Sequence, residues 1–224
     1  MEIEIPDGTL IFEDRREAGR ILAQQLLGYR DELPIVLGLP RGGVVVAYEI
    51  ARILNAPLDV VVARKLGVPG HEELGMGAIA PGGVRVLDEM AVQRLGITGS
   101  QIQTVAARET VEMNRRLRLY RGERPLPDLK NRTVILVDDG LATGVTAEAA
   151  IRFVRQHQPK RLVLAVPVCA AETAARLQAE VDALICACTP PDFGAVAVWY
   201  RHFEQTTDQE VIDLLESAAL DVTG

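Results

Sequence analysis

The sequence predicts an α/β fold, a doubly wound and mainly parallel β-sheet flanked by helices. Short apolar runs alternate with amphipathic helical patterns along the 224 residues, an order typical of parallel strands joined by crossover helices. One apolar run, 133–137, leads directly into Asp138 and Asp139, and a loop of small and hydroxyl residues then opens an alanine-rich helix. A second run, 34–38, leads in the same way into a loop with two adjacent glycines. Ligands of open α/β sheets bind at the carboxyl ends of such strands, so both loops are candidate ligand loops.

Strands are expected where apolar residues run between turn signals. In chain order they are 34–38, 58–63, 133–138, 161–166, 183–187 and 195–198. Residues 77–80 and 84–87 form a shorter pair divided by Pro81, Gly82 and Gly83, which indicates a hairpin or an edge loop of the sheet. Helices are expected where apolar residues recur with a period near 3.6. They are 15–27, 43–54, 100–121, 146–156, 170–178 and 208–217.

Residues 88–127 interrupt this alternation and are expected to form a helical insertion within a single domain, 1–224. A helix start at Asp88 and a turn with a capping residue at 97–100 precede a long polar helix. This helix carries interleaved acids and arginines, namely Arg108, Glu109, Glu112, Arg115, Arg116, Arg118 and Arg121. An arm for phosphate or nucleic acid is one interpretation, but the four-residue spacing of Glu112 and Arg116 favours an exposed, solvated helix.

The composition limits the classes of function. The chain is 48% hydrophobic and 25% charged, which is ordinary for a globular protein, and its net charge of −7 disfavours a nucleic-acid partner. It has no apolar run near the roughly 20 residues of a membrane helix, and its acidic N-terminus lacks the apolar core of a signal peptide. We therefore expect no membrane association and a cytoplasmic location. The cysteines Cys169, Cys186 and Cys188 lack the spacing of a zinc site and are expected to be buried free thiols.

The loop after Asp139 has the chemistry of a ribose 5-phosphate site. Its backbone N–H groups, the positive end of the helix dipole and the hydroxyls of Thr143 and Thr146 together form a phosphate cradle. Carboxylates repel phosphate, so Asp138 and Asp139 suit the vicinal hydroxyls of a sugar or the shell of a metal ion instead. The residues of the cradle are Gly140, Leu141, Ala142, Thr143, Gly144, Val145 and Thr146.

This segment resembles the 5-phosphoribosyl 1-pyrophosphate (PRPP) motif of the type I phosphoribosyltransferases, in which an apolar strand, two acids and small residues precede Thr-Gly-x-Thr. The resemblance implies the fold of that family, with a small hood over the sheet, and a 5-phosphate bound by 140–146. Asp138 and Asp139 would be catalytic residues that contact the ribose hydroxyls, or Mg²⁺ through water or PRPP. A generic strand–helix turn with an acidic end is the alternative.

The loop at 38–43 resembles the pyrophosphate loop of the same family. By this resemblance the substrate-binding residues are Pro40, Arg41, Gly42 and Gly43. The glycines allow backbone N–H groups to approach a ligand closely, and the guanidinium of Arg41 suits phosphate oxygens. Some members hold a cis peptide bond in this loop, which predicts one between Pro40 and Arg41. A plain glycine-rich turn is the alternative, although two phosphate loops in family order favour the joint interpretation.

Residues 63–77 resemble the flexible catalytic loop, which in this family closes over PRPP and excludes water. The glycines and Pro69 predict a long mobile loop. Arg64 and Lys65 stand at the end of a predicted strand, and the resemblance makes them catalytic residues that reach the pyrophosphate. His71 either assists proton transfer or is only a solvent-exposed loop histidine.

The C-terminal segment 189–205 resembles the hood over the acceptor, which the N-terminal segment 9–14 and the helix after it would complete. Phe193, Trp199 and Tyr200 are candidates for stacking on an acceptor base, and ordinary packing suits each of them as well. Purine-salvage members commonly carry an acidic metal ligand after the last strand, where this chain has Trp199 and Tyr200. The acceptor is therefore left open.

The resemblance extends over the whole chain in order and implies an enzyme. Such an enzyme transfers the 5-phosphoribosyl group from PRPP to a nitrogenous base or related amine and releases pyrophosphate, with Mg²⁺ as the cofactor. It also implies a homodimer and a role in nucleotide metabolism or nucleoside salvage. A PRPP- or nucleotide-sensing regulator on the same fold is the alternative. A hydrolase is disfavoured because the chain has neither a Gly-x-Ser-x-Gly elbow nor a Gly-x-x-x-x-Gly-Lys-Ser/Thr loop.

Overall fold

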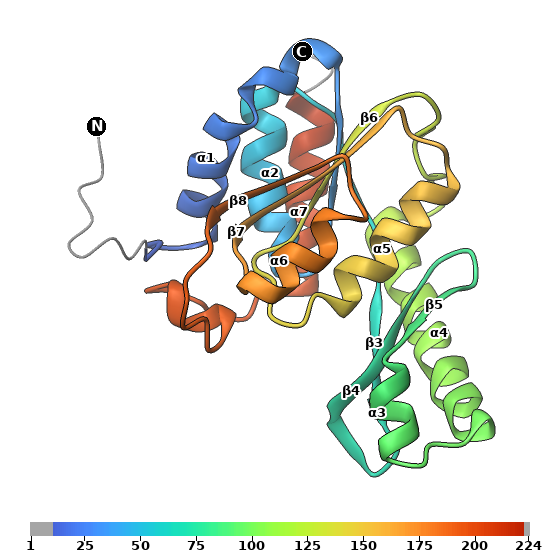
Figure 1. The fold of residues 1–224 in the computed structure, drawn as a ribbon. Helices are drawn as coiled ribbons and strands as arrows, with labels where there is room; N and C mark the ends of the chain where they lie inside the picture. The colour runs from blue at the N-terminus through green and yellow to red at the C-terminus, as the bar shows by residue number, and fades with distance from the viewer. Residues whose placement is uncertain (1–10, 222–224) are drawn as a thin grey trace.

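The computed structural model describes residues 11–221 and has a five-stranded parallel sheet at its centre (Figure 1). The strand order is β2 (Leu58–Val60), β1 (Ile35–Gly38), β6 (Thr133–Val137), β7 (Arg161–Val168) and β8 (Ala183–Cys188). The chain leaves β1 toward β2 and later returns on the other side of β1 as β6, so the direction of winding changes between β1 and β6. Ligands of open α/β sheets bind at such a switch point. The predicted doubly wound, mainly parallel sheet is confirmed.

Helices cover both faces of this sheet. On one face lie α1 (Arg15–Gln25), which continues into the 3-10 helix η2 (Leu27–Glu32), and α2 (Gly42–Leu54). The core on this side includes Leu22, Ile50, Val36, Ile135 and Val163. On the other face lie α5 (Val145–Gln156) and α6 (Ala171–Gln178), where the core includes Ile151, Leu177, Leu37, Leu136 and Leu164. Neighbouring strand residues thus alternate between the two cores, as the pleat requires.

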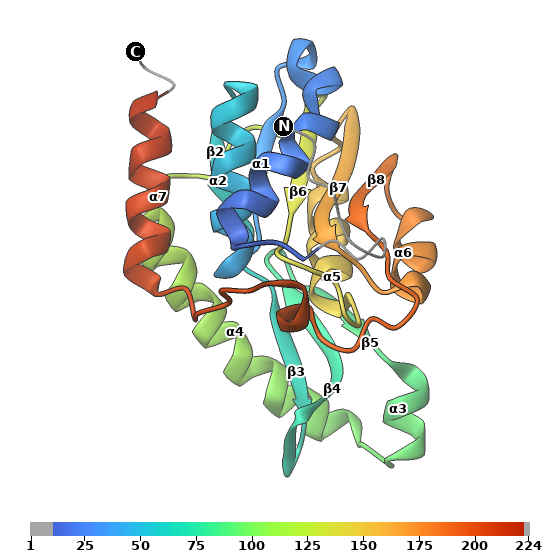
Figure 2. The ribbon, with the colours of Figure 1, turned by 90° about the vertical axis from the view of Figure 1, so that its left-hand side faces the viewer.

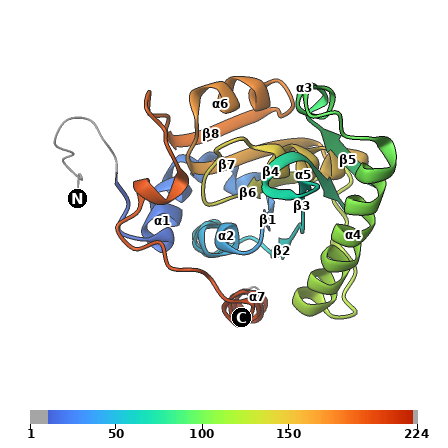
Figure 3. The same ribbon diagram turned by 90° about the horizontal axis from the view of Figure 1, so that it is seen from below.

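A smaller antiparallel sheet projects from this body. It consists of β3 (Arg64–Val68), β4 (His71–Ala80) and β5 (Val84–Leu87), in that order. The helices α3 (Glu89–Arg94) and α4 (Gly99–Arg121) follow, and α4 extends along the small sheet toward α7 (Asp208–Asp221), as Figure 2 shows. In Figure 3, α7 lies outside α2, away from the central sheet.

The β3–β4 hairpin corrects one expectation from the sequence. Residues 63–77 were expected to be a long mobile loop, but most of them pair in the antiparallel hairpin, which turns at 69–70. The reason is burial, because one side of the small sheet packs on α4 and the other on α5. The contacts with α4 include Leu66, Val68, Met76, Ile102, Val105 and Met113. The contacts with α5 include Ala78, Ala80, Val86, Ile151 and Phe153. The hairpin predicted for 77–80 and 84–87 is confirmed.

Residues 195–198 also differ from the expectation, because they are not a strand. Residues 196–198 belong instead to the 3-10 helix η3 (Val196–Trp199), after which the N–H of Tyr200 donates to the carbonyl of Ala197 at 3.3 Å. β8 ends at Cys188, and the chain reaches η3 through a bend at 191–192 and through Gly194, whose φ of 63° is left-handed. The strand predicted for 58–63 ends at Val60, although the N–H of Val61 still donates to Gly38 on β1.

Capping residues define the helix starts near the predicted positions. Asp14 accepts the N–H of Glu17 at the start of α1, and Asp88 accepts the N–H of Ala91 at the start of α3. Thr98 and Gln101 form a reciprocal capping box at the start of α4, which confirms the predicted turn and cap at 97–100. Within residues 11–221, no helix combines the length and apolarity that crossing a bilayer requires.

Candidate functional site

The two candidate phosphate loops meet at the switch point of the sheet. β1 and β6 are paired, with Gly38 opposite Val137, so the segments that follow them emerge side by side. The glycines of the first loop pack directly on the acids of the second. A Cβ on Gly43 would lie 2.9 Å from the Cα of Asp138, and a Cβ on Gly42 would lie 2.0 Å from Oδ2 of Asp139. Only glycine fits at either position without displacing the carboxylates.

The first loop has the predicted backbone. The peptide bond between Pro40 and Arg41 is cis, which confirms the expectation from the resemblance. Arg41 immediately precedes α2, whose first turn begins with Gly42. A terminal nitrogen of Arg41 lies 3.7 Å from Oδ1 of Asp208, at the start of α7, so an acid from the C-terminal helix partly neutralises this arginine.

The two acids have different surroundings. Asp138 accepts the N–H of Asp139 at 2.9 Å, and its pKa is raised well above the ordinary value by burial first and by the charge of Asp139 second. Oδ2 of Asp139 accepts a hydrogen bond from Nε of Arg15 at 2.8 Å, and the hydroxyl of Tyr200 donates to the backbone carbonyl of Asp139 at 2.5 Å. Asp138 is therefore the carboxylate left without a cationic partner among the described residues.

Arg15 is a site residue that sequence reasoning missed. Besides Asp139, it binds the carbonyl of Glu204 at 2.8 Å, and its guanidinium carbon lies 3.8 Å from the ring centroid of Phe203. One signal was available, because Arg15 occupies the first turn of α1, where the helix dipole disfavours a positive charge. A cation at a helix N-terminus suggests an acidic partner elsewhere in the fold.

Side chains of α6 hydrogen-bond to backbone carbonyls of the second loop, 140–146. The hydroxyl of Thr173 donates to the carbonyl of Ala142 at 2.5 Å, and Arg176 donates to the carbonyl of Thr143 at 2.6 Å. Gly144, with φ of 66°, then opens α5. Within the described part of the chain, the backbone N–H groups of 142–144 donate to no other residue. Held carbonyls, free N–H groups and a helix N-terminus together form an anion cradle. Thr173 and Arg176 were not singled out from the sequence.

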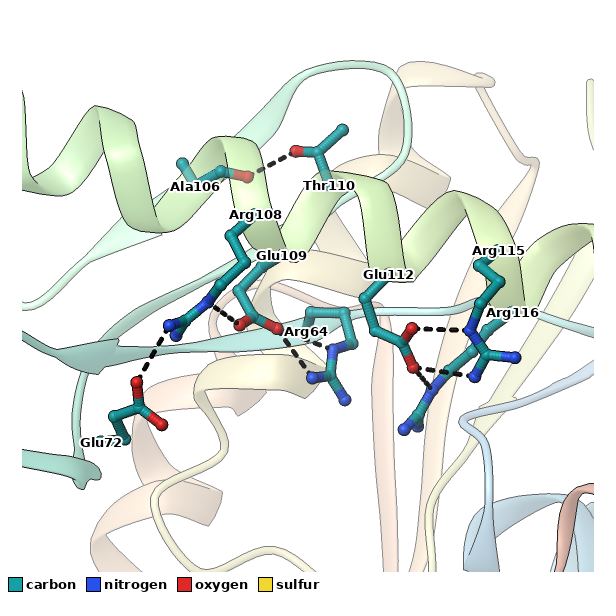
Figure 4. A network of polar contacts seen from close by, with 9 residues as sticks. All are labelled: Arg64, Glu72, Ala106, Arg108, Glu109, Thr110, Glu112, Arg115 and Arg116. Atoms are coloured by element: carbon teal, nitrogen blue, oxygen red, sulfur yellow. Dashed lines mark hydrogen bonds and ion pairs between the residues drawn. The ribbon is translucent and has the colours of Figure 1, made fainter.

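Each of the predicted catalytic cations of 63–77 has a hydrogen-bond partner outside the two loops. Two nitrogens of Arg64 donate to Oε2 of Glu109 on α4, at 3.0 and 2.7 Å (Figure 4). Lys65 lies on the opposite face of β3, and its ammonium donates to the carbonyl of Glu73 at 2.6 Å. Lys65 lines a cavity of about 790 Å³ whose other walls include Gly75, Thr143, Glu148 and Arg176. His71 is exposed at the start of β4.

The aromatic residues of the hood segment are mostly packed. Trp199 and Tyr200 are buried, and the ring of Tyr200 lies 5.4 Å from that of Phe12. The indole N–H of Trp199 donates to the carbonyl of Phe193, whose side chain is the more accessible of the three. The backbone at 12–13 bonds to 199–202, so the two chain segments expected to form the hood lie together. Residues 9 and 10 of the expected N-terminal part lie outside the described residues.

The donor set fits Mg²⁺ that is held mainly by substrate and water. No group of three or more His, Cys, Asp or Glu side chains that could hold a metal occurs within residues 11–221. Mg²⁺ usually keeps several waters and uses one or two carboxylates together with substrate phosphates. Asp138 can supply such a carboxylate, whereas Asp139 is engaged by Arg15. The cysteines are thiols, as predicted, with Cys169 buried and the other two half-buried.

Comparison with known proteins shows the family of this chain. The family described as "phosphoribosyl transferase domain" matches residues 11–198. Relatives from two strains of Mycobacterium tuberculosis, provisionally named phosphoribosyl transferases, are 44% identical over 211 residues, which is 94% of this chain. The chain spans about half, 48%, of the length of these relatives. The crystal structure of TT1426 from Thermus thermophilus is 44% identical, with a TM-score of 0.78, over 93% of this chain and 99% of that one. The chain belongs to the phosphoribosyltransferase family.

Proposed function

We propose that this protein transfers the 5-phosphoribosyl group of PRPP to a nitrogenous base or related amine acceptor and releases pyrophosphate. The observation that carries the proposal is the meeting of two anion-binding loops at the switch point of the sheet. The free N–H groups of 142–144 follow Asp138 in one loop, and Gly43 of the other loop packs on the Cα of Asp138. A molecule with a phosphate at one end, a diol in the middle and a pyrophosphate at the other matches this order.

In this proposal each part of the site has one task. The N–H groups of 142–144 and the N-terminus of α5 hold the 5-phosphate. Asp138 accepts hydrogen bonds from the ribose hydroxyls or from waters of a bound metal ion. Arg41 and the N–H groups of Gly42 and Gly43 hold the pyrophosphate. When bound, Mg²⁺ would neutralise part of the pyrophosphate charge.

The chemistry asked of the protein is electrostatic stabilisation and positioning. A nitrogen lone pair of the acceptor forms the new bond to C1 of the ribose while the bond from C1 to the pyrophosphate oxygen breaks, and the pyrophosphate leaves with that electron pair. The acceptor nitrogen then loses its proton to solvent or to a nearby base. Arg64 binds Glu109 through Nε and one terminal nitrogen, so its other terminal nitrogen is the group that can donate to the pyrophosphate.

The test is release of pyrophosphate from PRPP in the presence of Mg²⁺ and a panel of purines, pyrimidines and simple amines. We expect release that depends on one class of acceptor and is lost in Asp138→Asn. Binding of PRPP with no release for any acceptor would favour the sensing regulator instead. A folded protein that binds no PRPP would contradict both.

A further inference from the structure

One face of α4 carries a row of polar side chains that the proposed function leaves without a role. Glu109, Glu112, Arg116 and Tyr120 follow one another at intervals of three or four residues, so they lie along one stripe of the helix. In Figure 4, Glu109, Glu112 and Arg116 extend to the side of α4 on which Arg64 lies.

One end of this stripe binds Arg64 directly, and the other end is linked to Arg41 through Asp208. At one end, Glu109 accepts the two hydrogen bonds from Arg64. At the other end, the hydroxyl of Tyr120 donates to Oδ1 of Asp208 at 2.5 Å, and the same oxygen lies 3.7 Å from Arg41. The segment of α4 between these contacts therefore runs from the partner of Arg64 to the partner of Asp208, the acid beside Arg41.

Arg116 stands within that segment and has hydrogen-bonding capacity to spare. Its Nε donates to Oε1 of Glu112 at 2.7 Å, and within residues 11–221 its guanidinium makes no other hydrogen bond. Its side chain is 20% exposed, against 54% for the neighbouring Arg115, which binds the same Glu112. Arg116 thus points toward the protein, whereas Arg115 points toward solvent.

Arg116 lies about one helical turn before Tyr120, whose hydroxyl binds the aspartate beside Arg41. Burial is the largest cause that raises the pKa of Tyr120, followed by the hydrogen bond to Asp208. The charges of Arg116 and Arg41 both oppose this rise, so both guanidinium groups act on the same hydroxyl. A pyrophosphate group has enough oxygens to accept hydrogen bonds from several guanidinium groups at once.

We propose that Arg116 is a further pyrophosphate-binding residue and that the stripe on α4 forms one wall of the pyrophosphate site. This inference rests on the proposed function and names a part of its site that no motif marks. Each of the three arginines is held by an acid, namely Arg64 by Glu109, Arg116 by Glu112 and Arg41 by Asp208. The wall is therefore nearly neutral before binding, and guanidinium nitrogens that bind no carboxylate of the described residues are left for the anion.

The test uses the neighbouring arginine as a matched control. Magnesium pyrophosphate and, separately, ribose 5-phosphate are titrated calorimetrically into the wild-type protein, Arg116→Gln and Arg115→Gln. We expect Arg116→Gln to weaken pyrophosphate binding about tenfold, the size of one charge-assisted hydrogen bond, and Arg115→Gln to change it less than about twofold. Ribose 5-phosphate should bind all three proteins equally. Both substitutions remove a partner of Glu112, so a general effect on α4 would appear in both.

The outcomes separate this inference from the function on which it rests. If the wild-type protein binds pyrophosphate and ribose 5-phosphate, but Arg116→Gln and Arg115→Gln bind pyrophosphate with equal affinity, only the role of Arg116 is overturned. A folded wild-type protein that binds neither ligand would overturn the proposed function as well. If Arg116→Gln lowers the melting temperature, the charge-conserving variant Arg116→Lys is titrated as well. Tighter pyrophosphate binding by Arg116→Lys than by Arg116→Gln supports the inference, and equal binding by the two variants contradicts it.

Discussion

The adjacent carboxylates Asp138 and Asp139 should respond differently to replacement by asparagine. Burial and the charge of Asp139 raise the pKa of Asp138, which means that the fold disfavours the ionised form of this side chain. An amide at position 138 removes that charge, and its oxygen can still accept the N–H of Asp139, now bonded at 2.9 Å. Asp138→Asn should therefore leave the free energy of unfolding unchanged or raise it.

Asp139→Asn should instead destabilise the protein, because it leaves Arg15 without its carboxylate. The two groups are 2.8 Å apart, and their side chains are only 11% and 18% exposed. Loss of a charge-assisted hydrogen bond in such a pair costs about 2 kcal/mol. For a chain of this size that corresponds to a melting temperature lowered by about 4–8 °C.

Differential scanning calorimetry at pH 7 measures both effects. Arg15→Gln serves as the control, since it breaks the same pair from the other side. Its effect should not add fully to that of Asp139→Asn in the double variant. The reasoning is refuted if Asp138→Asn lowers the melting temperature as much as Asp139→Asn, or if the effects of Arg15→Gln and Asp139→Asn are fully additive.

Two further results are expected. Gly42→Ala should abolish PRPP binding, because its Cβ would lie 2.0 Å from Oδ2 of Asp139. Gly28→Ala is the control and should bind PRPP as the wild type does, because its Cβ meets nothing within 4 Å. Normal binding by Gly42→Ala in a calorimetric titration would contradict the close packing. Hydrogen bonding, first of all with Cys169, lowers the pKa of Cys186 to about 7. The rate of alkylation of Cys186 by iodoacetamide should therefore rise with pH around a midpoint near 7, and this midpoint should move to higher pH in Cys169→Ala. Mass spectrometry of the alkylated peptide checks this, and a wild-type midpoint near the ordinary 9 would be incompatible with it.

The predictable parts of the fold are those that depend on residues close together in the sequence. The sheet strands are continuous apolar runs, and the ligand loops combine a strand end, small residues and a helix start within about a dozen residues. The cis bond after Pro40 was predictable from the resemblance of its loop alone. Such features need no knowledge of distant contacts.

The errors arose where tertiary contacts override local composition. Glycines and Pro69 in 63–77 suggested a loop, but burial between α4 and α5 makes this segment a hairpin. The apolar residues of 195–198 suggested a strand, but residues 196–198 lie in a 3-10 helix that ends in the buried Trp199. Composition at either place does not reveal which neighbour covers the segment.

The polar partners of the site were equally hidden. Arg15 and Asp139 are 124 positions apart, and Arg64 and Glu109 are 45 apart. The sequence predicted that Arg64 would be a cation at the site, but not that an acid of α4 would hold it. Pairings of this kind depend on how the elements pack, which only the structure supplies.

The most direct test of the central claim is calorimetric titration of the wild-type protein and Asp138→Asn with PRPP in the presence of Mg²⁺. Micromolar binding by the wild type, lost in a variant that keeps its melting temperature, is the result that the meeting of the two phosphate loops predicts. Equal binding by both proteins, or no binding by a folded wild type, would contradict the assignment of this site to PRPP.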